Sequence, residues 1–425
     1  QERMLIIADN SKMNSIKRIF ERYGLRYAII GKVANHGNLV IKHGGQIVAN
    51  IPASIVANAP QASRHSKRPL YISRISGPLK PPPSRDLTKT LLTMLSKPAG
   101  SSKEWAYRQY DHEVGARTIL RPGEADAAVL RITDRKFISI KLDGNSKHCY
   151  IDPYHGTLGC LSESCRNVVC TGANPIGIID HLQFGSPENP EVFWTFKRAV
   201  SAIRNFCKFM KIPVVGGKVS FYNETHNGPI KPSPVIGAIG LIEEKRLIRR
   251  PSLKDGDTIF IIGSTKDEIG GSEYLESIHH ITGGNVPKLD LVVDKLNRRS
   301  VIRLIENDTV SSVHDCSKGG IATALCEMAI LGHVGFTVFI DDIPNSCSRI
   351  DNLLFSESHS RYVIGTQEPK KVQRILSDVK GLVFFQIGSA YNEKVVFKTK
   401  NEIVIDTNLR TLTRNFGGLE HVMSS

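Results

Sequence analysis

About fifty residues at the start of the chain repeat the pattern of a segment near its end. Each segment opens with an arginine and an apolar strand, continues with an amphipathic helix and a second strand, and closes with two more strands. The matched ranges are Arg3–Ala8, Ile16–Tyr23, Ala28–Gly31, Leu39–Ile41 and Ile47–Ile51 in the first segment, and Arg361–Gly365, Val372–Val379, Phe384–Gly388, Val395–Phe397 and Ile403–Ile405 in the second. Internal similarity of this length is typical of duplication. We therefore predict that residues 1–66 are the tail of an earlier copy of the C-terminal domain, and that the front of that copy is absent.

The composition indicates a mixed α/β protein with room for two or three domains. Of the 425 residues, 40% are apolar and 35 are glycine, which is ordinary for a globular chain. No apolar run reaches the ~18 residues that a membrane helix needs, and the start carries no apolar signal region. We expect a cytoplasmic location.

The eight cysteines show no paired framework. Cys160, Cys165 and Cys170 are evenly spaced, but steps of five residues rotate by about 140° along a helix, so the three sulfurs would not share a face. We interpret them as small buried thiols in a reducing compartment rather than as metal ligands.

The formal net charge of +15 is compatible with two kinds of partner. Nucleic acid is one of them, although the basic residues are spread along the chain without a dense block and with few interleaved aromatic residues. A field that attracts small polyanions, such as nucleotides and sugar phosphates, explains the charge equally well.

The chain after residue 66 divides into three parts. Prolines in residues 67–104 indicate a linker with one short helix, Leu87–Leu95. Residues 105–247 have the pattern of a domain rich in βαβ units, and residues 248–425 that of a second α/β domain. The main expected strands are Ala127–Ile132, Phe137–Leu142, Pro175–Ile179, Val235–Leu241, Thr258–Ile262 and Gly335–Ile340, and the main expected helices are Leu161–Thr171, Glu191–Met210 and Asp290–Glu306.

A glycine pair within residues 214–224 is the most informative local signal. A β-branched run leads into Gly216-Gly217, and Lys218 and Ser220 follow at once. A strand that ends in adjacent glycines leaves backbone N–H groups free to face an anion, as phosphate-binding loops do. The alternative is a tight turn between two strands. Gly319-Gly320, at the expected start of a helix, offers a second such cradle.

Four motifs identify a family that this chain resembles. They are Arg-Pro-Gly-x-x-Asp-Ala-Ala-Val-Leu from Arg121, Gly-Gly-x-Val-Ser-x-Tyr-Asn-Glu from Gly216, Gly-Gly-Ser-Glu-Tyr-Leu from Gly270 and His-Asp-x-Ser-x-Gly-Gly from His314. Together they closely resemble the synthetase subunit of phosphoribosylformylglycinamidine synthase. In that family two A-type and two B-type domains of the aminoimidazole-ribonucleotide (AIR) synthetase kind alternate. The resemblance implies that 1–66 ends the first B domain, that 105–247 is the second A domain, and that 248–425 is the second B domain.

The resemblance also implies roles for individual residues. Gly217, in the glycine-rich stretch with Gly216, and Asp180 would contact ATP. Ser220 would contact the formylglycinamide ribonucleotide substrate, as would Gln1. The family's catalytic histidine and most of its Mg²⁺-binding carboxylates lie in the first A domain, so no catalytic residue is expected in this chain.

Three departures from the family pattern bear on metal binding. Lys218 stands where the family usually has an asparagine that binds Mg²⁺, Gln183 replaces another asparagine, and Lys318 replaces an aspartate. An ammonium group cannot coordinate a cation. We therefore assign no metal ligand in this chain, and Lys218 is expected to meet phosphate directly unless other groups hold the metal.

Several motif residues have plain structural alternatives. His314-Asp315 is compatible with a helix cap, Gly270-Gly271 with a loop turn and 222–224 with a surface turn. His155 has the context of a loop histidine rather than that of a base. Glu224 and Asp180 are candidate partners of Mg²⁺ or of a ribose, although a lone carboxylate is a weak signal.

The resemblance implies one step of purine biosynthesis. Formylglycinamide ribonucleotide, ATP and glutamine-derived ammonia would give formylglycinamidine ribonucleotide, ADP and phosphate through an iminophosphate. The cofactors would be ATP and Mg²⁺, and the partners the N-terminal half of the subunit, a glutaminase subunit and a small bridging subunit. Alone, the chain would be inactive. The alternatives are a kinase of the same superfold with a single A–B unit, and a basic nucleic-acid-binding module, whose affinity would fall steeply with salt.

Overall fold

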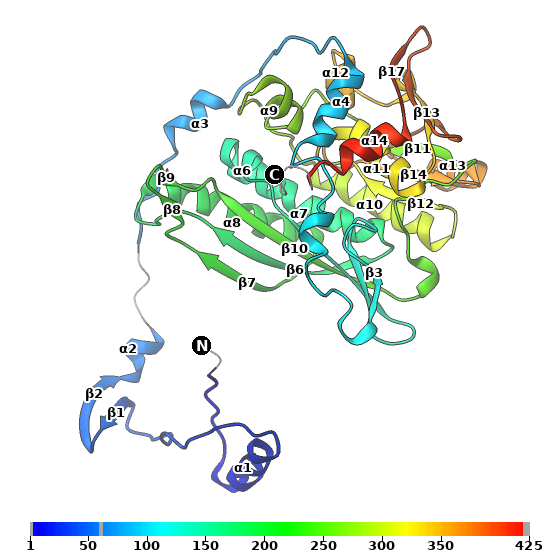
Figure 1. The fold of residues 1–425 in the computed structure, drawn as a ribbon. Coiled ribbons are helices and arrows are strands. Elements are labelled where there is room, and N and C mark those ends of the chain that lie inside the picture. The colour runs from blue at the N-terminus through cyan, green and yellow to red at the C-terminus, as the bar shows by residue number, and fades with distance from the viewer. Residues whose placement is uncertain (1–2, 59–62, 420–425) are drawn as a thin grey trace. The chain divides into compact units, whose positions relative to one another are not determined.

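The computed structural model describes residues 3–58 and 63–419. Contacts divide the chain into two compact units, Gln1–Ser63 (unit 1) and Arg64–Ser425 (unit 2), both drawn in Figure 1. Each unit combines helices with strands, so the predicted mixed α/β class is confirmed. No helix among the described residues is long and apolar enough to cross a membrane.

Unit 1 contains a helix, a hairpin and a short second helix. They are α1 (Met13–Arg22), β1 (Asn38–His43), β2 (Gln46–Pro52) and α2 (Ala53–Ala57), with a 3₁₀ turn, η1 (Asn10–Lys12), before α1. The Asp9 carboxylate accepts the Ser11 backbone N–H and so caps this turn. Gly44 and Gly45 both have positive φ at the tip of the antiparallel hairpin, a conformation that glycine adopts without steric cost. The predicted helix and the last two predicted strands of this segment are confirmed.

Two other strands predicted for unit 1, at residues 3–8 and 27–33, are wrong, because these residues form no regular structure. Their counterparts in unit 2 are β14 (Tyr362–Thr366) and β15 (Phe384–Ala390), and both pair with β11 (Thr258–Ile262). The described residues of unit 1 supply no strand equivalent to β11. A strand needs a neighbouring strand to satisfy its backbone N–H and C=O groups. Without that neighbour, neither segment forms a strand.

The first sheet of unit 2, sheet I, is almost entirely antiparallel. Its strand order is β3-β4-β5-β10-β6-β7, and β6 and β7 are the one pair of neighbouring strands that is parallel. The bounds are β3 (Thr118–Leu120), β4 (Ala128–Arg131), β5 (Phe137–Asp143), β6 (Asn174–Gln183), β7 (Val214–Ser220) and β10 (Ser233–Ile242), beside a small hairpin of β8 (Glu224–Thr225) and β9 (Gly228–Pro229). Two βαβ units are present, as predicted: β6–α8–β7, and β5–α7–β6, whose two strands run in the same direction on either side of the antiparallel β10.

Helices α6 (Ser146–Ile151), α7 (Pro153–Cys170) and α8 (Pro190–Met210) lie against sheet I. Figure 1 shows α7 and α8 along the strands β6, β7 and β10. Asp152 and Asn189 cap α7 and α8, and each helix has a proline at its first position, where the missing N–H costs nothing. Helix α7 begins eight residues before the predicted Leu161. All eight cysteines are free and six are buried, as expected for structural thiols.

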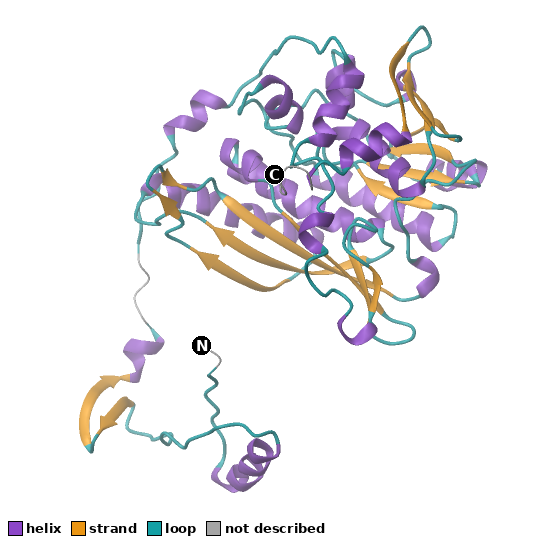
Figure 2. Ribbon diagram, in the orientation of Figure 1, coloured by secondary structure: helices purple, strands orange, loops and turns teal. Residues whose placement is uncertain are grey.

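The second sheet, sheet II, has the strand order β12-β14-β11-β15-β13-β16-β17. The strands not yet given are β12 (Ser312–Asp315), β13 (Phe336–Phe339), β16 (Lys394–Lys398) and β17 (Ile403–Asn408). On one face, α10 (Leu291–Glu306) and α13 (Pro369–Ser377) pack on Phe260 and Ile262 of β11. On the other, α11 (Gly320–Gly332) packs on Ile259 and Ile261. Figure 2 shows the helices around this sheet.

The remaining helices are α3 (Leu70–Ile75), α4 (Leu87–Ser96), α5 (Glu104–Tyr107), α9 (Glu273–His279), α12 (Ile350–Phe355) and α14 (Leu409–Phe416), and the remaining 3₁₀ turns are η2 (Val114–Ala116), η3 (Lys245–Leu247) and η4 (Ile340–Asp342). Helix α4 matches the predicted Leu87–Leu95. Its Leu91, Met94 and Leu95 are fully buried in the core of the sheet II region. This part of the expected linker is thus a packed element.

Candidate functional site

The glycine pair lies inside a strand rather than in a turn. Gly216 and Gly217 both belong to β7, the edge strand of sheet I, and Gly217 stands opposite Asp180 of the neighbouring parallel strand β6. Neither glycine has positive φ. The expected anion-binding turn and its tight-turn alternative are both wrong, because the chain does not reverse at these glycines. The absence of a side chain at Gly217 instead lets the Asp180 side chain of β6 lie close to β7.

Gly217 leaves room for the Asp180 carboxylate. A Cβ atom at residue 217 would lie 2.8 Å from Asp180 Oδ2, closer than carbon and oxygen can pack. Asp180 is half-buried, and burial raises the pKa of its carboxyl, while His181 opposes the shift. The carboxylate also helps burial to raise the pKa of the Cys207 thiol on α8. Asp180 and Gly217 therefore share the face of sheet I that α8 covers.

The neighbouring residues of β7 face the other way, since side chains alternate along a strand. A Cβ atom at Gly216 would contact Ile179, and the side chains of Ile179 and Leu142 both lie against Gly237 of β10. Ile179 and Leu142 are therefore on the same side of the sheet. We call this side the open face of sheet I. Lys218 and Ser220 follow Gly216 at steps of two, so both belong to the open face. The structure brings together the two residues expected to contact ATP and places Ser220 on the opposite face; Gln1 lies outside the described residues.

The loops after β6 and β7 are joined by hydrogen bonds. Asn223 donates from Nδ2 to the carbonyl oxygens of Phe184 (3.0 Å) and Ser220 (2.8 Å). Glu224 Oε1 accepts the Ser186 backbone N–H at 2.7 Å. Tyr222 is exposed and has positive φ. Residues 222–223 belong to the connection from β7 to the hairpin strand β8, which begins at Glu224, so the surface-turn alternative is not confirmed, and Glu224 is engaged in fixing the loop.

A second polar cluster lies between sheet I and sheet II. His314 Nδ1 lies 2.6 Å from Asp126 Oδ1, and His314 Nε2 lies 3.0 Å from Glu327 Oε2. These two carboxylates raise the pKa of the His314 imidazole well above its ordinary value, although burial opposes the shift. His314 and Asp315 belong to β12, so the helix-cap alternative is wrong.

Arg166 extends this cluster from the middle of α7. Its guanidinium is fully buried and contacts Asp315 Oδ2 through Nε (3.2 Å) and Nη2 (3.1 Å). Asp294 accepts hydrogen bonds from Ser162 and Ser360. The ion pair between Arg166 of α7 and Asp315 of β12 therefore links the helix that covers sheet I to sheet II, in addition to the apolar packing between them.

Within the described residues, Asp126, His314 and Asp315 form the one group whose ligand atoms are close enough to share a metal ion. The group does not fit a metal. Arg166 already neutralises the Asp315 charge. Both nitrogens of His314 face carboxylates, so the ring is held as an imidazolium, which has no lone pair for a cation.

The second glycine cradle is already filled. Helix α11 begins at Gly320 with Gly319 as its N-cap, as predicted. However, Glu357 Oε1 accepts the backbone N–H of Gly319 at 2.9 Å and that of Glu273, at the start of α9, at 2.8 Å. This buried carboxylate occupies the place between two helix N-termini that an anionic ligand would take.

The surroundings of Glu357 shift its pKa and those of nearby histidines. Burial raises the pKa of the Glu357 carboxyl to about 7. His148 Nε2 lies 3.5 Å from Glu357 Oε2, and burial lowers the pKa of that imidazole to about 3. His155 lies in the first turn of α7 rather than in a loop, and burial lowers its pKa as well. The Gly270-Gly271 loop abuts His148 and the backbone of Asn285, so it is closely packed.

The sequence reasoning did not single out several buried charged residues, among them Arg166, Asp294 and Glu357. One signal was available. Arg166 is a lone charge between Cys165 and the apolar pair Val168-Val169 in a helix, and a charge in such a place is usually buried and paired.

Comparison with known proteins defines the class. The family model described as AIR synthase related protein, N-terminal domain, matches residues 124–242, and the model for the C-terminal domain of the same proteins matches residues 254–399. The two matches cover sheet I and most of sheet II. The chain belongs to the AIR synthase related family.

Within that family, the chain is similar to PurL subunits of phosphoribosylformylglycinamidine synthase. The subunit of Alkaliphilus metalliredigens is 38% identical over 440 residues, which cover 100% of this chain and 58% of the relative. The subunit of Methanothermobacter marburgensis is 40% identical over 369 residues, 86% of this chain and 51% of the relative. The chain is a PurL homologue that spans little more than half the length of the relatives it matches.

Solved structures support the fold. PurL from Thermotoga maritima complexed with FGAR matches with a TM-score of 0.65 and 18% identity, over 78% of this chain and 54% of that one. The same protein complexed with ATP gives a TM-score of 0.61 and 18% identity, over 78% of this chain and 52% of that one. The predicted family and its domain types are thus confirmed.

Proposed function

We propose that this chain is the C-terminal part of a phosphoribosylformylglycinamidine synthase subunit, acting in purine biosynthesis. It would take part in an ATP-dependent C–N ligation that joins ammonia to formylglycinamide ribonucleotide and yields formylglycinamidine ribonucleotide. The observation that carries the proposal is the identity of 35–38% to PurL subunits along the full length of the chain.

The strand pair β6–β7 is the place we propose for ATP. Asp180 and Gly217 lie side by side, and Gly217 keeps the space next to the carboxylate open. ATP would supply the phosphoryl group that turns the amide oxygen into a leaving group, a reaction that depends on positioning and charge neutralisation. Asp180 would orient the nucleotide from the α8 side, and Ser220 would contact the ribonucleotide substrate from the open face.

The chain's own residues do not fit a Mg²⁺ site. Lys218 carries an ammonium where the family has a metal ligand, Asp180 is a single carboxylate beside Gly217, and the Asp126–His314–Asp315 group is neutralised by Arg166. Mg²⁺ prefers several oxygen ligands in octahedral geometry. We infer that the carboxylates for Mg²⁺ come from a first A-type domain outside this chain.

The open face of sheet I supports an interaction with that other half. Leu142 on this face is 60% exposed. Val215 is the extra residue of a bulge in β7 and lies against Gly177 on the same face, where it is 61% exposed, and β7 is an edge strand. An exposed apolar sheet face marks an interaction surface. We propose that it packs on the N-terminal half of the subunit, and that a glutaminase subunit and a small bridging subunit join the assembly in the cytoplasm. One PurL neighbour was solved as a complex named PurLQS.

The domain division follows from this proposal. Residues 1–66 would close a first B-type domain, residues 67–104 would connect it to the second A-type domain at 105–247, and residues 248–425 would form the second B-type domain. The shared order of helix and hairpin in α1–β1–β2 and in α13–β16–β17 supports the duplication.

An activity assay tests the proposal. The purified 425-residue chain is incubated with ATP, Mg²⁺, formylglycinamide ribonucleotide and ammonium chloride, alone and with a separately produced N-terminal half. Ammonium chloride replaces the glutaminase. We expect no formylglycinamidine ribonucleotide from the chain alone and product after mixing. Product from the chain alone, or none from the mixture when both parts are folded, contradicts the proposal.

A further inference from the structure

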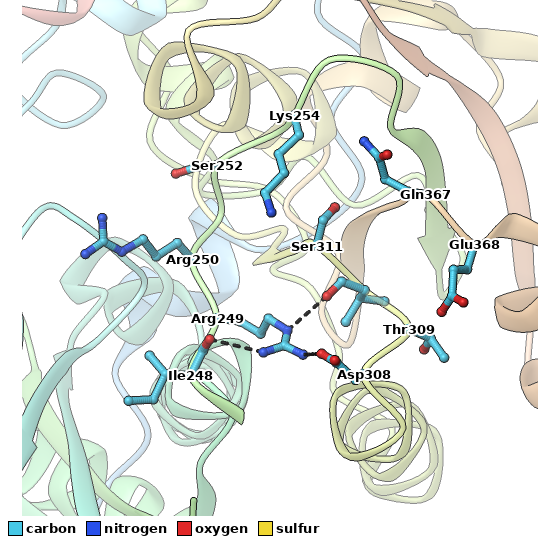
Figure 3. Close-up of a pocket in the computed structure, with 11 residues that line it drawn as sticks. Ile248, Arg249, Arg250, Ser252, Lys254, Asp308, Thr309, Ser311, Gln367 and Glu368 are labelled. Carbon is cyan, nitrogen blue, oxygen red and sulfur yellow. Dashed lines mark hydrogen bonds and ion pairs between the residues drawn. The ribbon is translucent and has the colours of Figure 1, made fainter. Parts of the chain in front are cut away.

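A cavity of about 480 Å³ lies where three loops of unit 2 meet (Figure 3). One wall is the segment 248–254 between η3 and β11. The others are residues 308–311, between α10 and β12, and residues 367–368, between β14 and α13. The first wall spans the boundary between the two family matches, which end at 242 and begin at 254. The cavity is therefore at the junction of the two domain types, remote in sequence from Asp180 and Gly217.

Arg249 lines this cavity, and its guanidinium group is held in place by neighbouring residues. Its Nε donates to the Val310 carbonyl oxygen at 2.9 Å, and its Nη1 donates to the Arg246 carbonyl oxygen at 2.6 Å. Its Nη2 pairs with the Asp308 carboxylate. Figure 3 draws this pair, the bond to Val310 and a further bond from Nη1 to the Ile248 carbonyl oxygen. With its donors used in this way, Arg249 holds the walls together and neutralises Asp308.

The other charged residues that line the cavity have partners, whereas the Lys254 ammonium has none among the described residues. Glu368, the other acidic residue of the lining, pairs with Lys371 at 3.2 Å. Arg250 lies 3.6 Å from Glu124 in a pair that is 53% and 38% exposed. Within the described part of the chain, the Lys254 ammonium makes no hydrogen bond or ion pair. Figure 3 shows it pointing into the space between Ser252 and Ser311.

We propose that this cavity binds a small phosphorylated metabolite, with the phosphate on the Lys254 ammonium. Lysine is a common point-charge partner of phosphate, and Ser252 lines the same cavity. The volume lies within the range of small-molecule sites, which is roughly 300–1,000 Å³. It leaves room for a sugar or nucleoside beside the phosphate.

Calorimetric titration of the full chain tests the proposal. The probes are inorganic phosphate, ribose 5-phosphate and AMP, with adenosine as the uncharged comparison. We expect the phosphorylated probes to bind and adenosine not to bind. Lys254→Met should weaken binding at least about tenfold, the equivalent of one lost charge-assisted contact, and Lys254→Arg should retain most of it.

Lys380→Met is the matched control, because Lys380 is exposed, lies outside the cavity and carries the same charge. It should leave binding unchanged within twofold. Gly217→Ala separates this site from the ATP site, since it should leave the binding of ribose 5-phosphate intact. Absence of binding by every phosphorylated probe overturns the proposal. So does equal loss in Lys254→Met and Lys380→Met, or a loss that follows Gly217→Ala.

Discussion

Asp126 and His314 join the two sheets of unit 2 through a 2.6 Å contact between Oδ1 and Nδ1. Asp126 lies just before β4 of sheet I, and His314 lies in β12 of sheet II. The Asp126 side chain is 2% exposed and that of His314 is 12% exposed, so this charge pair is almost sealed from water. Together with Arg166 and Asp315, it makes the association of the two sheets depend on buried charge.

We expect Asp126→Ala to destabilise unit 2 by about 3–5 kcal/mol, because it leaves a buried charge without its partner. The pKa of His314 is raised above its ordinary 6.5. The stabilisation is therefore complete below pH 6.5 and is lost as the pH rises through the raised value in the folded state. Urea unfolding of both proteins at pH 6 and pH 10 should show the larger difference at pH 6.

Asp134→Ala is the control for this variant, since Asp134 is exposed in the turn between β4 and β5. It should change the free energy of unfolding by less than about 0.5 kcal/mol. A cost for Asp126→Ala that is the same at both pH values would contradict the predicted loss of the His314 proton between them.

Glu357 makes the stability of the chain depend on pH in a lower range. Its pKa rises from 4.5 to about 7 on folding, so the folded state keeps a proton that the unfolded state loses. The contribution is present below pH 4.5 and is lost as the pH rises to about 7. We expect Glu357→Gln to remove this slope, so that it gains about 2–3 kcal/mol relative to wild type between pH 4.5 and pH 7.

The measurement is urea unfolding across this pH range, with Glu402→Gln as the control because Glu402 is exposed. The control should keep the wild-type slope. If Glu357→Gln kept that slope too, the Glu357 carboxyl would not be the group that titrates.

Gly217 and Gly216 offer a matched pair of substitutions on one strand. Alanine at 217 places a Cβ atom 2.8 Å from Asp180 Oδ2, whereas alanine at 216 meets nothing closer than Ile179 Cγ2 at 3.7 Å. We expect Gly217→Ala to displace the carboxylate and to weaken ATP binding by about tenfold, or ~1.4 kcal/mol. Gly216→Ala should bind ATP within about twofold of wild type. Equal affinities of the two variants, measured by calorimetry in the assembled subunit, would remove the Asp180–Gly217 edge from consideration as the ATP site.

The sequence predicted those elements whose signals are local. Helix α8 begins at Pro190 after the capping Asn189 and has apolar residues at helical spacing, and β11 is a run of β-branched and aromatic residues. The site was harder to predict. Asp180 and Gly217 stand in register because β6 and β7 are parallel neighbours, and no pattern within either strand reveals that pairing.

The failures arose where a tertiary partner decides the structure. Leu5 and Ile30 lie in segments with strand-like sequences, yet they are 74% and 81% exposed, because no strand among the described residues of unit 1 lies beside them. Glu357 closes the Gly319 cradle from a segment that is distant in the sequence. The strand propensity of a segment shows that it can form a strand. Whether it does so depends on the segments that lie next to it in the fold.

Hydrogen exchange tests most directly whether residues 1–66 are the tail of a larger domain. The chain is measured by mass spectrometry alone and after addition of the N-terminal half of the subunit. Alone, residues 3–8 and 27–33 should exchange rapidly, whereas their counterparts β14 and β15, which are paired on both sides, should be protected. After addition, both segments should become protected to the level of β14 and β15. Protection in the isolated chain, or rapid exchange in an assembled and active enzyme, would contradict the duplication.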